Sequence, residues 1–250
     1  MRRIWVDPDI IKGPTFELID EAFHHVIHVS RFRVGEEFEI LSGDTEALRV
    51  HICEIKKKSV QVEIIGRRKL PEIKRPYVNL AFALPKWNVF EEVIEKSVEL
   101  AVSEIQPLFT EHSFTRALRD WSPSRVKRFD KIIKSATEQT GRGQLLKIRR
   151  PLDICEFVQG LNQNTSVVGL FTYEGEKALS IKFEISRLIK SNPQEVWAIV
   201  GSEGGFSDAE VRYMKENGLP PVTMGNQILR ADTACIAAIS VIKYECGLMS

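Results

Sequence analysis

The chain has 250 residues, which is enough for one large domain or two small ones. Hydrophobic residues make up 43% and charged residues 28%, so the composition is that of an ordinary globular protein. No stretch approaches the roughly 20 apolar residues that span a bilayer, and the N-terminus lacks an apolar signal core. These features exclude a membrane protein and a secreted one, and we expect the protein to be cytoplasmic.

The four cysteines agree with that location. They form no Cys-x-x-Cys pair and no framework of close spacings, which favours reduced, buried thiols over disulfides. His24 and His28 are spaced so that a helix would bring them together, but no cysteine or aspartate spacing completes a zinc site. We therefore expect no bound metal.

Positive charge is concentrated in one segment, although the net charge of the chain is only +1. Between Arg116 and Arg150, eleven basic residues stand against three acidic ones, a net charge of +8. Such a block is typical of a surface that contacts phosphate groups. Arg125, Lys127 and Arg128 are the candidate contacts, with a solvated helix face as the alternative.

In chain order, the first predicted elements are β-strands, over residues 38–67. Apolar residues alternate there with polar or smaller ones, a period of two that is typical of half-buried strands; they are Leu48, Val50, Ile52, Val60, Val62 and Ile64. This pattern predicts a small antiparallel barrel or sheet.

A charged run with two prolines follows, over residues 67–76, and it predicts a linker. We place the linker at 71–76, between a first domain over 1–70 and a second over 77–250.

Strands and helices alternate in the second domain, which predicts an α/β layered fold. The apolar runs 77–84, 105–109, 167–171 and 196–200 are predicted strands, and the last two are continuous enough for buried parallel strands. Apolar residues recur at helical spacing from Phe90 to Ala101.

Helix boundaries are marked in the second domain. Ser122 and Pro123 open an amphipathic helix, and the sequence from Ser207 to Glu210 is a capping box. The helix that the box starts is predicted to end near Asn217 and Gly218, and a last helix is predicted from Asp232 to Cys246.

Two junctions between a strand and a turn carry the strongest functional signal. The strand over 196–200 continues into Gly-Ser-Glu-Gly-Gly-Phe-Ser at 201–207. The strand over 221–224 continues into Gly-Asn-Gln-Ile-Leu-Arg-Ala-Asp-Thr-Ala at 225–234. Glycine lets backbone approach a ligand closely, and ligands of α/β sheets bind at the carboxyl ends of strands. The two loops therefore predict a site for a small cofactor with an adenine-like part.

These motifs resemble those of the SPOUT class of S-adenosylmethionine-dependent RNA methyltransferases. Within that class they resemble the bacterial family that methylates N3 of a uridine in 16S ribosomal RNA. That family reads Gly-Pro-Glu-Gly-Gly-Phe-Ser and Leu-Gly-x-x-Ile-Leu-Arg-x-Glu-Thr-Ala, from which this chain departs at Ser202, Met224 and Asp232. The resemblance extends over the whole chain, including residues 25–31 and 136–142.

The resemblance implies a fold and partners that no spacing in the chain predicts. It implies a deep trefoil knot near the C-terminus and an N-terminal PUA-like β-barrel that binds RNA, with Arg31 and Arg33 as candidate phosphate contacts. Ribosomal RNA or the small ribosomal subunit would be the substrate, and the enzyme would be a homodimer. The last helix, apolar nearly all round, independently favours a dimer, with complete burial in one chain as the alternative.

Methyl transfer from a sulfonium needs placement more than acids and bases. We therefore expect the cofactor cleft to consist of backbone and apolar side chains: Leu170, Phe171, Thr172, Val200, Gly201, Gly204, Gly205, Met224, Gly225, Ile228, Leu229, Thr233 and Ala234. The alternative is that the glycines only make tight strand-to-helix turns.

Three charged residues are the candidates for catalysis. Because uridine N3 is a poor nucleophile while protonated, a group must remove or disfavour that proton. Arg230 would stabilise the developing anion or the phosphate, Glu203 would position Arg230 or act as the base, and Arg142 would hold the RNA. For Glu203 the alternative is a carboxylate bound to loop N–H groups, and for Arg142 a cation at a helix C-terminus.

Three other functions compete with this one. A catalytically silent RNA-binding module would be favoured if Glu203 or Arg230 were missing, and both are present. A ribose 2′-O-methyltransferase of the same class is the second. An enzyme that binds a phosphate cofactor in the Gly-Ser-Glu-Gly-Gly turn is the third, but the known phosphate-loop spacings are missing and Glu203 would repel phosphate.

Overall fold

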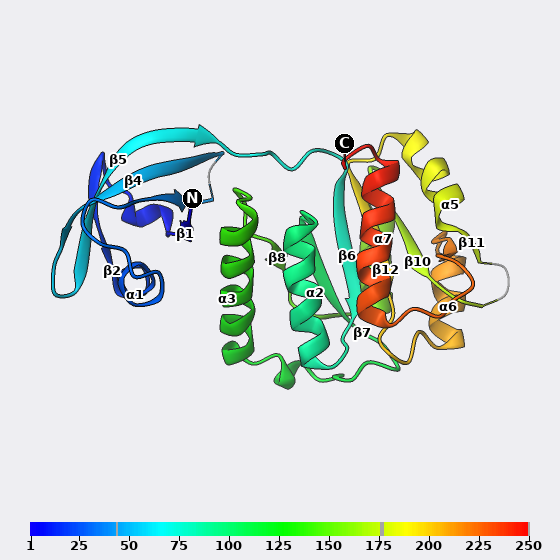
Figure 1. The fold of residues 1–250 in the computed structure, drawn as a ribbon. Helices are drawn as coiled ribbons and strands as arrows, with labels where there is room; N and C mark the ends of the chain where they lie inside the picture. Colours follow the sequence, from blue (N-terminus) through cyan, green and yellow to red (C-terminus); the bar gives the residue numbers. More distant parts are fainter. Residues whose placement is uncertain (44, 176–177, 250) are drawn as a thin grey trace. The chain divides into compact units, whose positions relative to one another are not determined.

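The computed structural model describes residues 1–43, 45–175 and 178–249. Its contacts group the chain into two compact units, which Figure 1 shows in sequence colours. The first unit consists of Met1–Glu72 and Ile133–Leu145, and the second of Ile73–Ile132 and Leu146–Ser250. None of the helices in the described part of the chain is both long and apolar enough to cross a membrane.

The first unit is built on a five-stranded sheet in the order β1-β3-β4-β5-β2. All neighbouring pairs are antiparallel except β1 and β3, which are parallel. The strands are β1 (Arg3–Trp5), β2 (Thr15–Ile19), β3 (Glu37–Leu41), β4 (Glu46–Ile55) and β5 (Ser59–Lys69). The short helical segments are η1 (Pro8–Ile10), α1 (Asp20–His24) and the π-helix η2 (His25–Val29).

The alternation in residues 38–67 correctly predicts strands and their inner face. Val50, Ile52 and Val60 are at most 1% exposed and belong to one core cluster, whereas His51 and Cys53 point to the other face and are half-buried. The sequence did not indicate β1 and β2, and β1 makes the sheet mixed where an antiparallel one was expected. The charged run begins inside β5, because the antiparallel pairing with β4 continues to Lys69.

The second unit is a parallel sheet covered by helices. The strand order is β11-β13-β10-β12-β6-β7-β8, with β9 also paired to β7. The strands are β6 (Tyr77–Ala83), β7 (Glu104–Phe109), β8 (Lys147–Ile148), β9 (Leu152–Asp153), β10 (Val167–Thr172), β11 (Leu179–Ser180), β12 (Glu195–Val200) and β13 (Pro221–Thr223). The buried parallel strands expected at 167–171 and 196–200 are therefore confirmed as β10 and β12.

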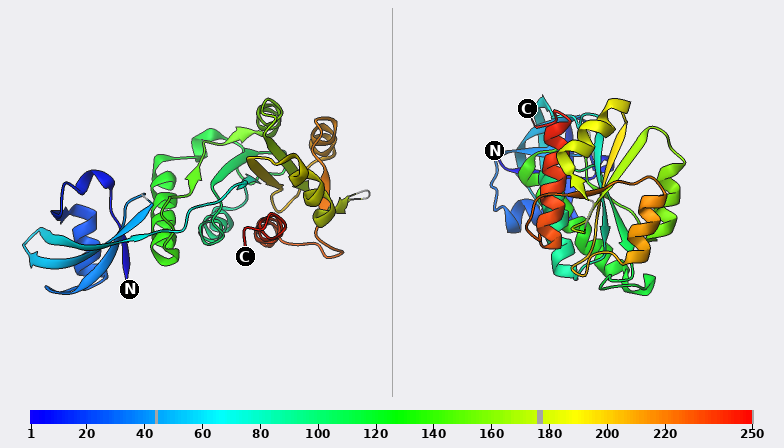
Figure 2. Two further views of the ribbon diagram at one scale, coloured as in Figure 1. Left: turned by 90° about the horizontal axis from the view of Figure 1, so that it is seen from above. Right: turned by 90° about the vertical axis from the view of Figure 1, so that its right-hand side faces the viewer.

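Helices lie on both faces of this sheet. Figure 2 shows α2 and α7 on one face and α4 and α6 on the other. The helices are α2 (Trp87–Glu99), α3 (Pro123–Thr140), α4 (Ile154–Asn162), α5 (Ile181–Leu188), α6 (Asp208–Glu216) and α7 (Ala231–Glu245), with short 3-10 turns η3 (Leu118–Asp120) and η4 (Ile189–Ser191). The first half of α3 packs through Phe129 on Phe90, with ring centroids 5.2 Å apart.

The expected helix boundaries are confirmed by specific hydrogen bonds. The capping box at the start of α6 is complete: Ser207 Oγ accepts from the Glu210 N–H at 3.4 Å, and Glu210 Oε2 accepts from the Ser207 N–H at 2.8 Å. Asn217 is the C-cap of α6, and Gly218 follows with φ +79°, a left-handed conformation that suits glycine. Pro123 is the first residue of α3.

Strand direction determines where a ligand can bind. Because β6, β10, β12 and β13 are parallel to their neighbours, their carboxyl ends meet at one edge of the sheet. Both motif loops follow such ends, after β12 and after β13. The α/β topology therefore brings the loops together, although they are about twenty residues apart in the sequence.

Candidate cofactor site

A cavity of about 720 Å³ lies at this edge, entirely within the second unit. Four loops line it, after β6, β10, β12 and β13. The lining residues are Lys86, Asn88 and Val89; Thr172, Tyr173, Glu174 and Gly175; Val200, Gly201, Ser202, Glu203, Gly205 and Phe206; and Val222, Thr223, Met224, Gln227, Ile228, Leu229, Arg230, Ala231, Asp232 and Ala234. This volume suits a cofactor of nucleoside size.

The glycines of the loop after β12 have different physical roles. A Cβ at Gly201 would lie 3.0 Å from the Gly205 Cα, and one at Gly204 would lie 2.9 Å from the His112 Cβ. These two glycines therefore permit close packing of the loop. Gly205 has φ +68° and open space where a Cβ would be, so it is required by backbone conformation.

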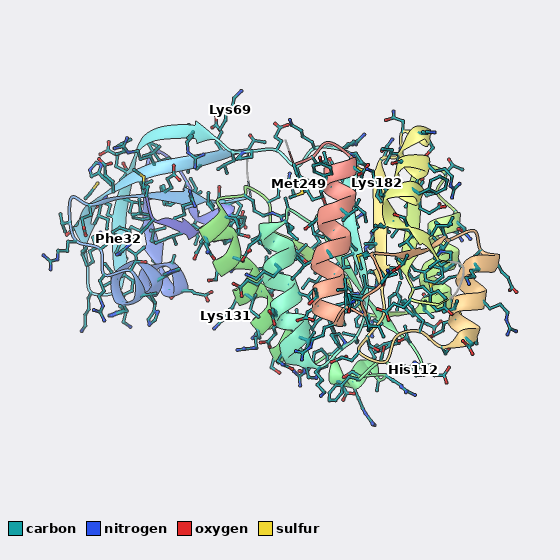
Figure 3. All side chains as sticks on the ribbon, turned by 45° about the vertical axis from the view of Figure 1, so that its right-hand side comes forward. Phe32, Lys69, His112, Lys131, Lys182 and Met249 are labelled. Carbon is teal, nitrogen blue, oxygen red and sulfur yellow. The ribbon has the colours of Figure 1, made fainter. Side chains whose placement is uncertain are left out.

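His112 and Ser202 hold that loop in place. The Ser202 hydroxyl donates to the His112 carbonyl oxygen at 2.7 Å, and His112 Nδ1 lies 2.9 Å from the Gly204 carbonyl oxygen. His112 comes from the segment after β7 and is labelled in Figure 3. Ser202, which stands where the resembled motif has proline, is thus a structural hydrogen-bond donor.

Glu203 lines the cavity and is exposed. Its Oε1 accepts a hydrogen bond from the Lys86 backbone N–H at 3.3 Å. This bond links the loops after β12 and β6, and it is the kind of contact that the non-catalytic interpretation of Glu203 expects. Among the residues that the structure describes, no hydrogen bond to the second carboxylate oxygen opposes a catalytic role.

The loop after β13 presents apolar surface to the cavity. Ile228 is 83% exposed, and such an uncovered side chain beside a cavity favours a ligand with an apolar face. The Leu229 N–H donates to Glu174 Oε1 at 3.3 Å, which connects this loop to the one after β10. Gly225 has φ +130°, and nothing lies within 4 Å of where its Cβ would be.

Arg230 is the N-cap residue of α7 and lines the same cavity. Its side chain makes no capping hydrogen bond and is exposed. The fold therefore brings Glu203 and Arg230 into one cavity wall. A guanidinium in this position can contact an anion that enters the cavity.

Most of the residues expected to bind a cofactor lie in the wall, and the others lie beside it. Leu170 and Phe171 are 0% exposed and belong to the core of the sheet, because β10 continues past them to Thr172. Leu170, Phe171, Gly204, Gly225 and Thr233 are not part of the lining.

Sequence reasoning missed the wall contributed by the loop after β6. The signal was present, because Pro85 and Lys86 directly follow the apolar run 77–84, which contains β6 in the structure. Tyr173 and Glu174 were missed in the same way, two and three residues beyond the expected strand end at Phe171. Phe206 and Asp232 lie inside the motifs and line the cavity.

Comparison with known proteins agrees with this architecture. A family model described as an RNA methyltransferase domain matches residues 72–243, and one described as an RNA methyltransferase PUA domain matches residues 18–65. The chain belongs to the RNA methyltransferase family. The family expected from the two loop motifs is therefore confirmed, as is the combination of a PUA domain with an α/β methyltransferase domain.

Relatives of this methyltransferase align over nearly its full length. The ribosomal RNA small subunit methyltransferase E of Synechocystis sp. is 31% identical over 242 residues, which cover 96% of this chain and 76% of that protein. The protein of the same name from Bacillus subtilis is 27% identical over 259 residues, covering 100% and 98%.

Solved structures of similar proteins share the fold. A ribosomal RNA small subunit methyltransferase E from Neisseria gonorrhoeae, bound to S-adenosyl methionine, has a TM-score of 0.83 at 25% identity and covers 98% of this chain and 97% of that one. A methyltransferase from Legionella pneumophila, in complex with the bound cofactor SAM, has a TM-score of 0.85 at 30% identity, covering 97% and 96%.

The basic segment of the methyltransferase is not one free cationic face. Arg128 forms a bidentate ion pair with Glu91, and the distance from Arg128 Nη2 to Glu91 Oε2 is 2.6 Å. Arg125 lies over the Trp87 ring at 4.0 Å. Lys127 and Lys131 are exposed on α3, and Figure 3 labels Lys131. Much of the charge that the sequence assigns to phosphate contact is thus shared with groups of the same chain.

Arg142 lies outside the cavity, in the first unit. It follows Gly141, which has φ +74° just after the end of α3, so it stands next to a helix C-terminus. Its side chain is only 7% exposed, and burial lowers its pKa to about 10. The guanidinium is therefore a buried cation that stays charged at neutral pH. Its place just after α3 agrees with the expected alternative, a cation at a helix C-terminus.

Arg31 and Arg33 lie together at a hollow of about 850 Å³ in the first unit. Arg2 lies there as well, over the Phe32 ring at 5.4 Å from its centroid. Glu36 also lines the hollow, and it accepts a hydrogen bond from the Arg33 N–H. The three arginines outnumber the two carboxylates of the hollow, Glu36 and Glu37, and give this part of the first unit the net positive charge that a phosphate contact needs.

Proposed function

We propose that this protein methylates N3 of a uridine in small-subunit ribosomal RNA with S-adenosylmethionine as the methyl donor. The cavity formed by the two motif loops is the observation that carries the proposal, because it joins glycine turns, an apolar shelf and Arg230 in one wall. The names of the full-length relatives, which are small-subunit ribosomal RNA methyltransferases, support the substrate class.

The cavity fits S-adenosylmethionine chemically. Its charged lining residues are three carboxylates, Glu174, Glu203 and Asp232, and two cations, Lys86 and Arg230. The carboxylates favour the cofactor's sulfonium and amino groups and disfavour a polyphosphate. Ile228 and Leu229 would pack on the adenine, and backbone groups of residues 201–205 and 224–229 would bind its edge. When bound, the cofactor supplies an activated methyl group.

Arg230 and Glu203 are the residues to which we assign the chemistry. Arg230 supplies a guanidinium to the cavity wall, and a guanidinium can favour the deprotonated uridine without taking the proton itself. Glu203 keeps the loop after β12 fixed to Lys86 and either positions Arg230 or accepts the N3 proton. Arg142, at 7% exposed, is better suited to holding the end of α3 than to direct contact with the nucleotide.

Two parts of the chain would bind RNA. One is the first domain, over residues 1–70, and the other is the basic segment 116–150 of the second domain, which covers 77–250. In the first domain the contacts would come from Arg31 and Arg33 at their hollow. In the second they would come from Lys127, with Arg125 and Arg128 contributing less because Trp87 and Glu91 already engage them. N3 is on the Watson–Crick edge, so the target base must be unpaired or flipped out.

We also propose that the enzyme is a homodimer through α7. Ala237 and Val241 are half-buried and Tyr244 is 73% exposed in the single chain, and all three lie on one side of the helix at spacings of four and three. A second copy would cover this apolar stripe.

A trefoil knot near the C-terminus belongs to the same proposal. After β13, near one edge of the sheet, the chain returns to pack α7 on β6 and β12 at the centre, and such a return is what a knotted crossing requires. An experimental structure whose trace from 167 to 249 simplifies to an unknotted line would contradict this part.

Equilibrium binding of three cofactors tests the proposed function. S-adenosylmethionine should bind the full chain at a single site, whereas ATP and NAD should not compete for it. Tight ATP or NAD binding at this cavity would support the phosphate-cofactor alternative. Failure of all three to bind would leave the silent RNA-binding module.

A further inference from the structure

Three side chains that can bind a metal converge on the outer face of the hairpin formed by β4 and β5. His51 and Cys53 come from β4, and Glu63 lies directly opposite His51 on β5. Cys53 Sγ is 3.4 Å from His51 Nε2, and His51 Nε2 is 3.7 Å from Glu63 Oε2. All three ligand atoms lie within 4.8 Å of one another.

These separations are those of ligands around a tetrahedral ion. With metal bonds of about 2.3 Å to sulfur and about 2.0–2.1 Å to nitrogen and oxygen, tetrahedral ligand atoms stand roughly 3.3–3.6 Å apart. Two of the observed distances are within a few tenths of an ångström of this range. Small rotations of the half-exposed Glu63 side chain are sufficient to complete the geometry.

A local irregularity of β4 contributes to the convergence. The pairing of β4 with β5 shifts register between Ile52 and Glu54, which leaves Cys53 as the extra residue of a bulge. Bulges re-aim side chains and occur often at functional sites. Cys53 is thereby brought to the imidazole of His51 instead of standing over its own cross-strand partner.

We propose that His51, Cys53 and Glu63 form a binding site for a zinc-class divalent transition-metal ion, with water as the fourth ligand. A thiolate, an imidazole and a carboxylate together suit Zn²⁺ or Co²⁺, whereas Mg²⁺ and Ca²⁺ prefer sets of oxygen ligands. The site is independent of the methyltransferase cavity, since every ligand lies in the first unit.

The neighbouring groups leave the three ligands available. Glu37, opposite His51 on β3, is held by Arg49 at 2.8 Å and therefore does not complete the set. Burial and the Glu63 carboxylate raise the pKa of the Cys53 thiol, so an incoming metal must displace the thiol proton. The competing interpretation is a plain hydrogen bond between His51 and Cys53.

Titration of the untagged, metal-free full chain with Co²⁺ tests the site. Because cobalt is coloured when bound by thiolate in a tetrahedral site, we expect thiolate-to-cobalt absorption that saturates at one equivalent and is bleached by Zn²⁺ but not by Mg²⁺. His51→Gln and Cys53→Ser should each weaken Co²⁺ binding by at least ~10-fold, because the loss of a group that only hydrogen-bonds to a metal ligand already costs that much affinity. No saturable absorption in the wild type would overturn the proposal.

Two control variants and an alkylation experiment on the wild type test whether Co²⁺ and Zn²⁺ bind at this site. Glu54→Gln, next to the site, and Cys155→Ser, a half-buried thiol of the second unit, should bind Co²⁺ like the wild type. In the wild type, Zn²⁺ should slow alkylation of Cys53 but not of Cys155, as peptide mapping would show. Protection of Cys155 instead, or binding that is unchanged in the Cys53→Ser variant, would overturn the site.

Discussion

At the scale of single residues, the glycines of the two motif loops are constrained by different forces. Gly201 and Gly204 are fixed by contact, since a Cβ at either would lie 2.9–3.0 Å from a neighbouring atom. Gly205 and Gly225 are fixed by positive φ, with open space beside them. Only the second kind leaves room that a ligand can use, so substitution at Gly225 separates ligand binding from packing.

Gly225→Val should weaken cofactor binding by placing a branched side chain beside the cavity wall at Met224. Gly218→Val is the matched control, because Gly218 also has positive φ and an open Cβ position but lies at the end of α6. Both variants should lose similar stability from the strained backbone. Calorimetric titration with S-adenosylmethionine should show affinity at least about tenfold lower, or about 1.4 kcal/mol, for Gly225→Val alone.

Equal losses of affinity in the two valine variants would mean that backbone strain, and not the cavity, explains the effect. Wild-type affinity in a folded Gly225→Val variant would remove the loop after β13 from the cofactor site.

At the scale of elements, the sequence correctly predicted those helix starts and strands that depend on interactions between residues close together in the chain. The capping box at Ser207, the proline that begins α3 and the alternation in β4 each depend on neighbours a few residues away, and each is found in the structure. The short strands β1, β8 and β11 have two or three residues and gain their order from pairing. No periodicity within so few residues can predict such strands.

The candidate site likewise has parts that the local sequence predicts and parts that depend on contacts between distant segments. Both glycine loops were identified from their motifs, but the part of the wall at Lys86 depends on β6 lying next to β12 in the sheet. The burial of Arg142 and the pairing of Arg128 with Glu91 likewise depend on contacts between distant segments. The charge pattern alone therefore overestimated the cations that are free for RNA.

The start of α6 connects the cofactor loop to the helix layer, and its cap can be tested. Ser207→Ala removes the acceptor for the Glu210 N–H, and should reduce the free energy of unfolding by about 1 kcal/mol. For a chain of this size, that lowers the melting temperature by about 2–4 °C. Ser166→Ala serves as the control in differential scanning calorimetry, because within the described part of the chain the Ser166 hydroxyl bonds only to the nearby Asn164 side chain.

A Ser207→Ala melting temperature equal to that of the control would show that Glu210 alone holds the start of α6, through its bonds to the Ser207 and Glu111 N–H groups.

At the scale of the whole molecule, the proposed dimer would cover a surface that the single chain leaves exposed. That surface is the apolar stripe of α7, and Val241→Arg should place a charge in the proposed dimer interface. Light scattering at micromolar concentration should give a dimer mass for the wild type and a monomer mass for the variant. Lys215→Glu, on the exposed face of α6, should remain dimeric. A monomeric wild type would refute the dimer.

RNA affinity should depend strongly on salt. Each lost phosphate contact should reduce the slope of log affinity against log salt concentration by roughly 0.7–0.9. Lys127→Gln should show that reduction, whereas Arg128→Gln should show less of it, because Glu91 already neutralises Arg128. Filter binding over a salt series measures both slopes. An Arg128 effect equal to or larger than the Lys127 effect would mean that RNA displaces Glu91.

We propose that this protein makes N3-methyluridine, with Arg230 stabilising the deprotonated base. The most direct test of this proposal is to incubate unmethylated small-subunit ribosomal RNA or small subunits with the protein and S-adenosylmethionine, then to digest the RNA and identify the nucleosides by mass spectrometry. We predict N3-methyluridine at a single position. Arg230→Ala should lower turnover by about 100-fold or more while still binding the cofactor. A 2′-O-methylated nucleoside would rule out N3 as the methylated atom, and wild-type turnover in Arg230→Ala would rule out the role of Arg230.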